Sequence, residues 1–575
     1  MEERIFAHTT IHELYEQHIL SALDFHFAQF IGTLSNSRDT SLLLAAALTS
    51  YAHTHGHICF NLAQPYIFEQ NVSLRLPDVK AWQNALLHSN VVGRANEFKP
   101  LILDQQRLYL QRYWQYEQQL ISSIQQRLHQ SIPNNLVVNN DALITTKQLH
   151  KDQMAAIATA ISHYFCIISG GPGTGKTSTV VNILLQLVLA QPQLRIALTA
   201  PTGKAATRLQ ETINTVKQTL THPIAEQLPQ QAMTIHRLLG VVLNSPYFKH
   251  NADNLLPYDV VVVDEASMID LPLMTKLAHA IPLTSRWILL GDKDQLASVE
   301  AGTVLGDLCE VGLKQETTSE LQGSITLLTK SYRFNQEQGI GALAEAVKQG
   351  HSQKALHILK STHYPEVDWL DLNDCEDFVD CMAQHVLSGF VAYLKEKKPQ
   401  AALAKFNRFR VLCALRHGRY GVVTINRLIE YLLRQHELIP TQYQWYHGKP
   451  IMITQNDYTL NLFNGDVGIT LWNEQNELQV FFPMADGEIR SFLPTRLPAH
   501  ETVYAMTIHK SQGSEFDNVF MLLPQQSSPI LTRELVYTGI TRAKSTVSVW
   551  GTENVLKQAI RQKVERYSGI HSLLG

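Results

Sequence analysis

The segment Phe165–Val180, with the sequence FCIISGGPGTGKTSTV, constrains the fold more than any other part of the chain. It begins as an apolar run, continues as a glycine-rich bend and ends in Gly175, Lys176 and Thr177, directly before an apolar pattern of helical period. This G-x-x-x-x-G-K-T spacing predicts a strand, a phosphate-binding loop and a helix in succession. The glycines allow successive backbone N–H groups to face one anion at the positive end of the helix. The chain is therefore expected to contain an α/β domain that binds a nucleoside triphosphate.

The side chains of this loop have separate expected roles. Lys176 is expected to neutralise the β- and γ-phosphates, and the Thr177 hydroxyl is expected to bind magnesium. The residues predicted to surround the nucleotide here are Gly170, Gly171, Pro172, Gly173, Thr174, Gly175, Lys176, Thr177 and Ser178.

An acidic pair follows a second buried strand. Val260–Val263 is a run of four valines, and it ends in Asp264 and Glu265. Four apolar residues of high strand propensity are typical of a parallel strand that is covered on both faces. Asp264 is expected to hold the magnesium through water, and Glu265 is expected to orient and deprotonate the attacking water.

Three further side chains are candidates for contact with the transferring phosphoryl group. Gln295 follows the apolar strand 287–290, where it can detect the γ-phosphate. Arg333 can act as an arginine finger, and Arg542 lies where a helix can aim it at a phosphate. Two α/β halves, one phosphate loop and two isolated arginines predict a nucleotide held between two domains, with the second half supplying both arginines.

Length and composition limit the alternatives. A chain of 575 residues is expected to form about three or four domains. The net charge of −3 carries no polybasic signature, so contact with nucleic acid must come from a local groove. The six cysteines have no C-x-x-C spacing, which favours reduced thiols over a disulfide framework or a zinc site. The N-terminus lacks the pattern of a signal peptide, and no run approaches the roughly 20 apolar residues of a membrane span. These features predict a cytoplasmic protein.

The N-terminal region shows apolar positions spaced by three and four residues, and it predicts a helical domain over 1–110. Its alternating His53, His55, His57 and Cys59 allow a metal site on a strand, but a short strand or loop without metal is the preferred interpretation. Residues 101–128 are expected to form one amphipathic helix whose aromatic stripe joins this domain to the nucleotide-binding domain. The stripe consists of Tyr109, Tyr113, Trp114 and Tyr116. A polar stretch, 131–141, predicts a linker, so the linking region is placed at 111–142.

Two segments offer donors to a phosphodiester backbone where a strand meets a helix. One contains Pro201, Thr202 and Lys204, and the other contains His236. Helix N-termini that carry hydroxyl, lysine or histidine donors suit contacts with backbone phosphates. Between 448 and 493 the pattern changes to short alternating strands with turn signals, which predicts a small β-barrel inserted at 447–495.

Seven segments, in this order, resemble those of the superfamily-1 DNA helicases of the RecD type. They are GGPGTGKT (170–177), TAPTGKAA (199–206), VDEASMID (263–270), GDKDQL (291–296), SYRF (331–334), TIHKSQGSEF (507–516) and YTGITRAK (537–544). They cover the chain from about 145 to 550. The N-terminal GHIC (56–59) and LDQQRLYLQRYW (103–114) resemble RecD subunits, the exodeoxyribonuclease V alpha chains. The helix-hairpin-helix region of the longer stand-alone RecD-like helicases is not found in the sequence.

The resemblance implies a fold and a set of roles. It implies two RecA-like motor domains with parallel sheets, at 143–325 and 326–575, and an SH3-like barrel inserted in the second. It implies that Gln153 reads the adenine and that Gly513 and Glu515 lie near the nucleotide, with Glu515 at the ribose or nearby motor contacts. It implies that Pro201, Thr202, Lys204, His236, Thr507 and His509 lie along the DNA.

The resemblance also implies an activity and partners. It implies ATP- and Mg²⁺-dependent unwinding with 5′→3′ movement on single-stranded DNA. It further implies a RecB–RecC–RecD heterotrimer that processes double-strand breaks for recombination, in which residues 1–100 dock on RecC. No nuclease constellation is found in the sequence, so nuclease activity of such a complex is expected in another subunit. One alternative is a stand-alone protein, either a RecD-like DNA helicase without a nuclease complex, an ATP-dependent translocase or an RNA helicase. The other is a non-enzymatic subunit that uses nucleotide as a switch.

Overall fold

The computed structural model describes residues 4–6, 11–37, 39–64, 72–74, 76–132, 149–218, 224–314, 319–334, 339–374, 377–484 and 487–574. For 4–6, 72–74 and 224–225 only the backbone is described. The predicted linker at 131–141 and the predicted start of the motor at 143 lie almost entirely outside these residues.

The first motor domain is built on a six-stranded parallel sheet in the order β12-β7-β11-β10-β8-β9. Its strands are β7 (Phe165–Gly170), β8 (Ile196–Ala200), β9 (Ala232–Thr234), β10 (Val260–Val263), β11 (Arg286–Gly291) and β12 (Ile325–Leu328). Every residue of β7, β10 and β11 is buried, as expected for parallel strands with both faces covered. The predicted parallel-sheet motor is confirmed.

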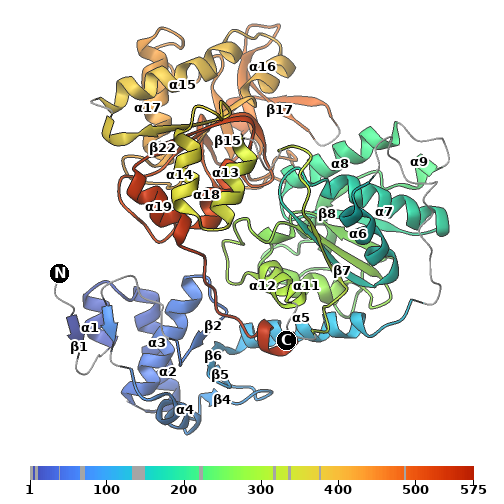
Figure 1. The fold of residues 1–575 in the computed structure, drawn as a ribbon, viewed down its shortest axis with the longest axis vertical. Helices are drawn as coiled ribbons and strands as arrows, with labels where there is room; N and C mark the ends of the chain where they lie inside the picture. Colours follow the sequence, from blue (N-terminus) through green and yellow to red (C-terminus); the bar gives the residue numbers. More distant parts are fainter. Residues whose placement is uncertain are drawn as a thin grey trace.

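Helices cover both faces of this sheet (Figure 1). One face packs against α6 (Lys151–Ser162), α7 (Lys176–Ala190) and α8 (Gly203–Lys217). The other packs against α5 (Gln111–Leu128), α10 (Ile235–Leu239), α11 (Leu271–Ala280) and α12 (Val304–Leu313). Successive residues of β7 alternate between the two cores, because Ile167 packs in one and Ile168 in the other. A short helix, α9 (Ile224–Gln227), precedes β9.

The second motor domain has a five-stranded parallel sheet in the order β13-β22-β21-β14-β20. The strands are β13 (Val367–Asp371), β14 (Phe409–Cys413), β20 (Ala505–Thr507), β21 (Phe516–Leu522) and β22 (Ala543–Gly551). The helices are α13 (Gly339–Lys348), α14 (Ser352–Lys360), α15 (Phe378–Leu394), α16 (Pro399–Phe406), α17 (Val422–Gln435), α18 (Arg533–Ile540) and α19 (Glu553–Arg561). Since β12 pairs with β7, the first domain extends to Leu328, beyond the predicted boundary at 325.

A five-stranded antiparallel sheet is inserted between α17 and β20, in the order β18-β17-β16-β15-β19. Its strands are β15 (Pro450–Ile453), β16 (Val467–Trp472), β17 (Leu478–Pro483), β18 (Ile489–Phe492) and β19 (His500–Thr502). The insertion has a small core of its own. Its last strand lies beyond the predicted end at 495. Among the described residues no pairing joins β18 to β19, so the SH3-like barrel stays a prediction.

The prediction of a purely helical N-terminal domain is wrong, because this domain also contains strands. It contains α1 (Ile11–Glu16), α2 (Ala22–Ser35), α3 (Thr40–Thr54) and α4 (Val79–Leu87), and a parallel pair, β1 (Arg4–Phe6) with β3 (Val72–Leu74). A four-stranded sheet in the order β2-β6-β5-β4 completes it. These strands are β2 (Cys59–Asn61), β4 (Val92–Gly93), β5 (Leu101–Asp104) and β6 (Arg107–Leu110).

The predicted helix 101–128 is therefore wrong over its first ten residues. Residues Leu101–Leu110 form a hairpin, in which Asp104 pairs with Arg107. Gln105 turns the chain at φ 54°, a left-handed conformation that a helix cannot contain. Apolar residues fill both faces of this hairpin, so their spacing fits a buried strand as well as a helix.

The helix that follows the hairpin, α5, leads from the N-terminal domain onto the first motor domain (Figure 1). The Thr275 hydroxyl of α11 donates to the carbonyl of Tyr116 at 3.0 Å. Arg127 Nη2 donates to the carbonyls of Ala278 at 3.2 Å and Ile281 at 2.6 Å. Tyr113, Trp114 and Tyr116 lie on α5, whereas Tyr109 lies on β6.

The C-terminal segment returns to the first motor domain, a feature that the sequence analysis missed. After α19 the chain runs down to α20 (Ile570–Leu574), which packs beside α5 (Figure 1, red). The Gly569 N–H donates to Glu117 Oε1 at 2.7 Å, and the Ser319 hydroxyl donates to the Leu574 carbonyl at 2.9 Å. We call residues 562–574 the C-terminal strap.

Three further expectations, on the thiols, the N-terminal histidines and membrane spans, can be compared with the structure. Cys59, Cys166, Cys309 and Cys413 are free and buried, but Cys381 is disulfide-bonded, so the expectation of reduced thiols is wrong there. His53 and His55 end α3 instead of lying on a strand. No described helix is long and apolar enough to cross a membrane.

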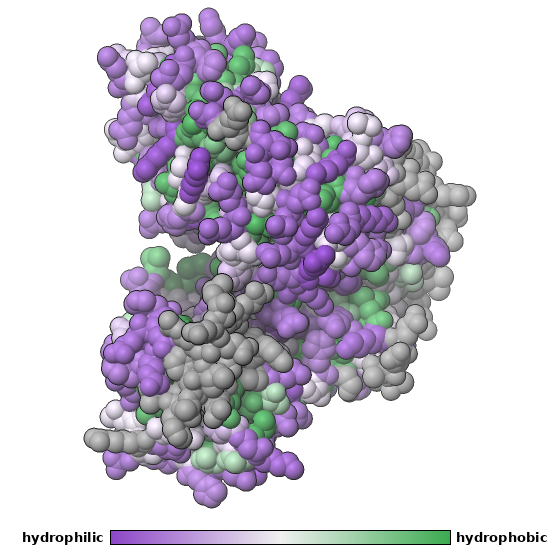
Figure 2. Space-filling view, turned by 60° about the vertical axis from the view of Figure 1, so that its left-hand side comes forward, coloured by the Kyte–Doolittle hydropathy of each residue, from purple (hydrophilic) through white to green (hydrophobic). Residues whose placement is uncertain are grey.

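The face drawn in Figure 2 is mostly hydrophilic and is hollowed between the second motor domain and the N-terminal domain.

Candidate active site

The phosphate loop connects β7 to α7 as the sequence predicts. Gly173 and Gly175 have φ of 76° and 83°, a left-handed conformation in which a side chain is strained. The Thr174 hydroxyl donates to the Gly171 carbonyl at 2.8 Å and closes the bend. Lys176 Nζ folds over the loop and donates to the carbonyls of Gly170 at 2.5 Å and Gly171 at 3.2 Å. The ammonium therefore lies directly above the backbone that is expected to surround the phosphates.

A cavity of about 250 Å³ opens beside this loop and collects most of the predicted site residues. They reach it from the phosphate loop, from the ends of β10 and β11 and from the second motor domain. Its lining includes Pro172, Gly173, Gly175, Lys176, Thr177, Ser178, Asp264, Glu265, Gln295, Arg333, Gly513, Glu515 and Arg542. Residues that the sequence singled out, up to 370 positions apart in the chain, thus line one cavity.

The acidic pair lies at the carboxyl end of β10. Glu265 has φ 52°, an uncommon conformation for a glutamate, and its N–H donates to Asp264 Oδ1 at 2.9 Å. Burial, reinforced by the Glu265 carboxylate, raises the pKa of Asp264 to about 6, while Lys176 opposes the shift. Asp264 and Thr177 line the same cavity and offer carboxylate and hydroxyl oxygens. These are the donors that Mg²⁺ prefers, so the residues fit the metal.

Gln295 is held by a carboxylate that contacts both motor domains. Gln295 Nε2 donates to Asp292 Oδ2 at 3.1 Å, and the Tyr537 hydroxyl donates to the same oxygen at 3.1 Å. The Leu296 N–H donates to Thr538 Oγ1 at 3.0 Å. Asp292 and Tyr537 lie inside the motifs GDKDQL and YTGITRAK, but no role was predicted for either residue.

The two arginines reach the cavity from different parts of the fold. Arg542 follows α18, is buried, and donates to the carbonyls of Thr538 at 3.1 Å and Ser514 at 3.2 Å. Burial lowers the pKa of Arg542, against the nearby Glu265. Arg333 was expected on the far wall, in the second motor domain. Instead it follows β12 on a segment that lies on the phosphate loop, where the neighbouring Tyr332 N–H donates to the Gly173 carbonyl at 2.8 Å.

Gln153, the predicted adenine reader, lies at the start of α6. Its Oε1 accepts from the His150 N–H at 3.1 Å and from the Tyr332 hydroxyl at 2.9 Å. The Tyr332 side chain is exposed beside it, so an aromatic face lies next to the amide. The SYRF segment contained this tyrosine, but the sequence analysis gave a role only to the arginine. The adenine-reading role stays a prediction.

Two of the predicted DNA contacts, Thr202 and Lys204, lie where the two motor domains touch. Thr202 caps α8, and its hydroxyl accepts from the Ala205 N–H at 3.3 Å. Gly513, in the loop after Thr507 and His509, packs so closely that an added Cβ would lie 3.7 Å from Thr202 Oγ1. Lys204 Nζ lies 5.7 Å from the centre of the Phe516 ring. Burial, aided by Arg410, lowers the pKa of Lys204 to about 8.

Three other predicted contacts are Pro201, Thr507 and His236. Pro201 directly precedes the Thr202 cap. Thr507 ends β20, and its hydroxyl accepts from the Lys510 N–H at 3.2 Å. His236 lies on α10 with its ring 5.6 Å from that of Phe248. Phe463 of the insertion packs against Gly203, so the inserted sheet reaches the same place. Phe463 was not predicted as a site residue, because its approach depends on how the insertion folds back.

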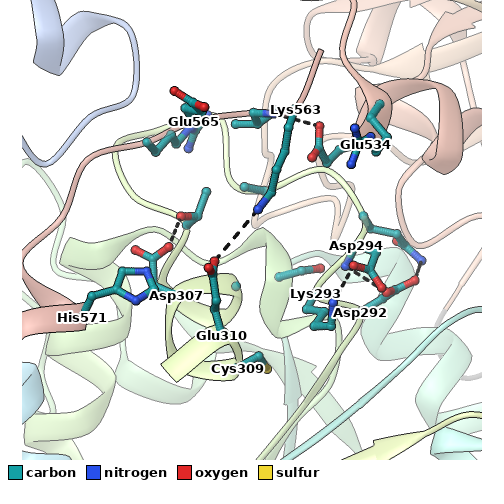
Figure 3. Close-up of a pocket in the computed structure, with 18 of the residues that line it drawn as sticks. Asp292, Lys293, Asp294, Asp307, Cys309, Glu310, Glu534, Lys563, Glu565 and His571 are labelled. Carbon is teal, nitrogen blue, oxygen red and sulfur yellow. Dashed lines mark hydrogen bonds and ion pairs between the residues drawn. The ribbon is translucent and has the colours of Figure 1, made fainter. Parts of the chain in front are cut away.

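A second cavity, of about 570 Å³, lies between both motor domains and the C-terminal strap. Figure 3 shows that acidic and basic side chains face one another across it. Lys293 pairs with Asp294 at 2.7 Å, and Lys563 of the strap lies 4.0 Å from Glu310. Its charges are largely paired internally. No group of three His, Cys, Asp or Glu among the described residues is placed to hold a metal ion.

Comparisons with known proteins follow the same division of the chain. Residues 16–109 match the family model of the RecBCD enzyme subunit RecD N-terminal domain. Residues 153–301 match an AAA domain, and 502–549 match a UvrD-like helicase C-terminal domain. The chain is 37% identical to the RecBCD enzyme subunit RecD of Haemophilus influenzae, over 98% of this chain and 99% of that protein.

Two other relatives are informative. The RecBCD enzyme subunit RecD of Mycolicibacterium smegmatis is 38% identical, over 97% of this chain and 98% of that protein. The ATP-dependent RecD2 DNA helicase of Deinococcus radiodurans is 30% identical, but the match covers 81% of this chain and only 58% of that protein.

Proposed function

Because this chain belongs to the family of RecD subunits of the RecBCD enzyme, we propose that it is an ATP-dependent DNA helicase subunit that moves 5′→3′ along single-stranded DNA. The observation that carries the proposal is the 250 Å³ cavity, in which the phosphate loop, the acidic pair, Gln295 and two arginines converge from both motor domains. Such a site is complete only when the domains approach each other, which couples hydrolysis to their movement. The direction of movement is inferred from the family.

Each site residue has a proposed task. Lys176 and the loop N–H groups bind the β- and γ-phosphates, and Glu265 takes the proton of the attacking water. Arg333 and Arg542 stabilise charge on the transferring group, and Gln295 detects the γ-phosphate. Thr177 and Asp264 would hold Mg²⁺, which would supply positive charge that neutralises the phosphates when bound.

The DNA is proposed to bind where the loops of both motor domains meet. Thr202, Lys204 and His509 supply donors there, and the helix N-terminus of α8 favours a phosphate. The exposed tail of a duplex end provides such a single strand. We place the protein in the cytoplasm, where the DNA that it processes lies.

RecB and RecC subunits are the proposed partners, in a heterotrimer that processes double-strand breaks for recombination. The N-terminal domain is the proposed docking module. Its helix α2 exposes Leu23, Phe30 and Leu34, which are 63%, 58% and 46% accessible. Spacings of seven and four residues put the three side chains on one face of the helix. Apolar side chains gathered on one helix face are typical of a surface that another protein covers.

A strand-displacement assay tests this function. Duplexes with a 5′ tail or a 3′ tail are offered to the chain with and without its co-purified partners. We expect unwinding of the 5′-tailed duplex, dependent on ATP and Mg²⁺. Unwinding of only the 3′-tailed duplex would contradict the direction, and no displacement in either preparation would contradict helicase activity.

A stand-alone RecD-like helicase is the second candidate. The similarity to the RecD2 helicase favours it, since the match spans most of this chain. The matches to RecD subunits over nearly their whole length favour the first candidate. Co-purification decides between them, because the second candidate predicts full unwinding by the chain alone and no bound partner.

A further inference from the structure

Arg208 is a cation of the nucleotide cavity that neither the sequence motifs nor the functional assignment uses. It lies on α8, the helix that Thr202 caps, and it lines the cavity together with Lys176 and Glu265. Burial acts to lower the pKa of Arg208, but the Glu515 carboxylate outweighs it and the net shift is upward. The guanidinium is therefore a permanent positive charge beside the proposed phosphate site.

Glu515 holds this arginine and a second one at once. Its Oε1 pairs with Nη2 of Arg208 and, at 2.7 Å, with Nη2 of Arg333. The Glu515 side chain is only 9% exposed. Although burial acts to raise its pKa, the two arginines hold the pKa of Glu515 at about 2. The carboxylate is thus fully charged at neutral pH and binds two guanidinium groups from the other wall.

The cavity has more donors than its own carboxylates satisfy. Four cationic side chains, Lys176, Arg208, Arg333 and Arg542, face three carboxylates, Asp264, Glu265 and Glu515. Among the described residues, the buried Nη1 of Arg333 has no hydrogen-bond partner. A phosphoryl group has several acceptor oxygens and matches the planar fork of arginine as well as a carboxylate does.

We propose that Arg208 is a phosphate-binding residue of this cleft and that Glu515 is its exchangeable counter-charge. The γ-phosphate takes over the guanidinium groups of Arg208 and Arg333 that Glu515 otherwise holds. This inference rests on the proposed ATP site. It differs from a ribose-binding role for Glu515, because the carboxylate faces the arginines of the phosphate side.

The exchange would connect the γ-phosphate to the DNA-binding loops. Arg208 and Thr202 belong to the same helix, and Glu515 and Gly513 belong to the loop that packs on Thr202. When the γ-phosphate replaces the carboxylate, a contact between the two motor domains at this point is released. Loss of the phosphate restores it.

The test measures equilibrium binding of ADP and of ATPγS, with Mg²⁺, to the full-length chain. Arg208→Gln should weaken the binding of ATPγS by about 10- to 100-fold, as expected for loss of a charged hydrogen bond. The affinity for ADP should be unchanged. Arg208→Lys keeps the positive charge without the planar guanidinium, so its loss of ATPγS affinity should be smaller. Glu515→Gln should strengthen ATPγS binding by about tenfold, because the competing carboxylate is removed.

Two control variants match these changes elsewhere. Arg195→Gln removes an arginine that pairs with Asp259 at 3.2 Å, and Glu553→Gln removes a carboxylate that pairs with Lys360 at 2.6 Å. Both should bind ADP and ATPγS as the wild type does. The inference would be overturned if Arg208→Gln weakened the binding of ADP and of ATPγS equally, or if it weakened neither. It would also be overturned if Glu515→Gln bound ATPγS more weakly than the wild type does.

A further variant separates this inference from the proposed function. Lys176→Gln should lose binding of both nucleotides. If Lys176→Gln binds them normally, the proposed ATP site itself is wrong. If Lys176→Gln loses binding but Arg208→Gln does not change the preference for the γ-phosphate, only the inference about Arg208 is wrong.

Discussion

Glu265 is the residue on which turnover depends most directly. Its backbone is held at φ 52° directly after β10, and its side chain lines the nucleotide cavity. Glu265→Gln should keep ATP binding, because Lys176 and the loop remain, but should slow hydrolysis by about 100- to 10,000-fold, as for loss of a general base. Single-turnover hydrolysis measured beside equilibrium binding checks this. Near-normal turnover would refute the base role.

Asp264 illustrates a conflict between stability and function. Its pKa is raised from 3.8 to about 6, chiefly by burial, so the folded protein binds a proton more readily than the unfolded chain. Stability is therefore lost as pH rises from about 4 to 6, and the loss is complete above that range. Asp264→Asn should raise the melting temperature at pH 7.5, and this gain should shrink as pH falls towards 4.

The same variant should lose activity. Without the carboxylate that orients the metal, Mg²⁺-dependent turnover should fall by roughly 10- to 100-fold. Thermal unfolding at several pH values, beside ATPase assays, checks both effects. A variant that is less stable than the wild type at pH 7.5 would show that burial of the charge has no net cost.

At the scale of elements, the C-terminal strap ties the N-terminal domain to the motor. The Tyr567 N–H donates to His57 Nδ1 at 3.0 Å, and the Ile58 N–H donates to the Tyr567 carbonyl at 2.9 Å. Arg566 Nη1 donates to the carbonyls of Glu300 at 2.9 Å and Gly302 at 3.0 Å. The strap therefore reaches the segment that follows Gln295, so the N-terminal domain is coupled to the loop that is proposed to detect the γ-phosphate.

His57 makes this attachment sensitive to acid. Burial, aided by Arg566 and His55, lowers its pKa from 6.5 to about 4, so the folded state favours the neutral ring that accepts the hydrogen bond. The stabilisation is present above pH 6.5 and is lost as pH falls towards 4, by ~2 kcal/mol at pH 5. His57→Asn keeps an acceptor that does not titrate. Its melting temperature should fall less than that of the wild type between pH 7 and 5, and equal decreases would contradict the assignment.

At the scale of the whole molecule, the domain that carries no chemistry is expected to determine assembly. Phe30→Glu combined with Leu34→Glu should release the chain from its partner subunits, because two charges would enter an apolar interface. DNA-stimulated ATPase activity should be unchanged, since among the described elements α2 packs chiefly on α3 and α1 of its own domain. Co-purification and ATPase assays measure the two effects.

The double substitution tests docking more specifically than deletion of residues 1–100 would, because the deletion also disturbs the fold. The deletion would remove β2, which pairs with β6, and would uncover a hairpin that packs on the motor core. Leu493→Glu, at a leucine that is 45% exposed in the second motor domain, is the matched control and should stay in the complex. Retention of the doubly substituted chain in the complex would contradict docking through α2.

Most of the residues that line the 250 Å³ cavity were identifiable from the sequence alone. Its signals are local, because a glycine-rich loop, an acidic pair after four valines and Gln295 after an apolar strand each lie within a few residues. The carboxyl ends of parallel strands meet at one edge of a sheet, so these local signals converge without further information. The parallel sheets of both motor domains were predictable for the same reason, from buried strands that alternate with helices.

Only the tertiary structure decided the features that depend on contacts between distant residues. The hairpin at 101–110 shares its apolar spacing with a helix, and only pairing with β2 distinguishes the two. The strap, the Asp292–Tyr537 hydrogen bond and the Arg208–Glu515–Arg333 cluster join residues from separate elements. A residue pattern records which side chains are apolar or charged, but not which ones meet. That choice follows from how the domains pack, because burial and pairing energies depend on the partner.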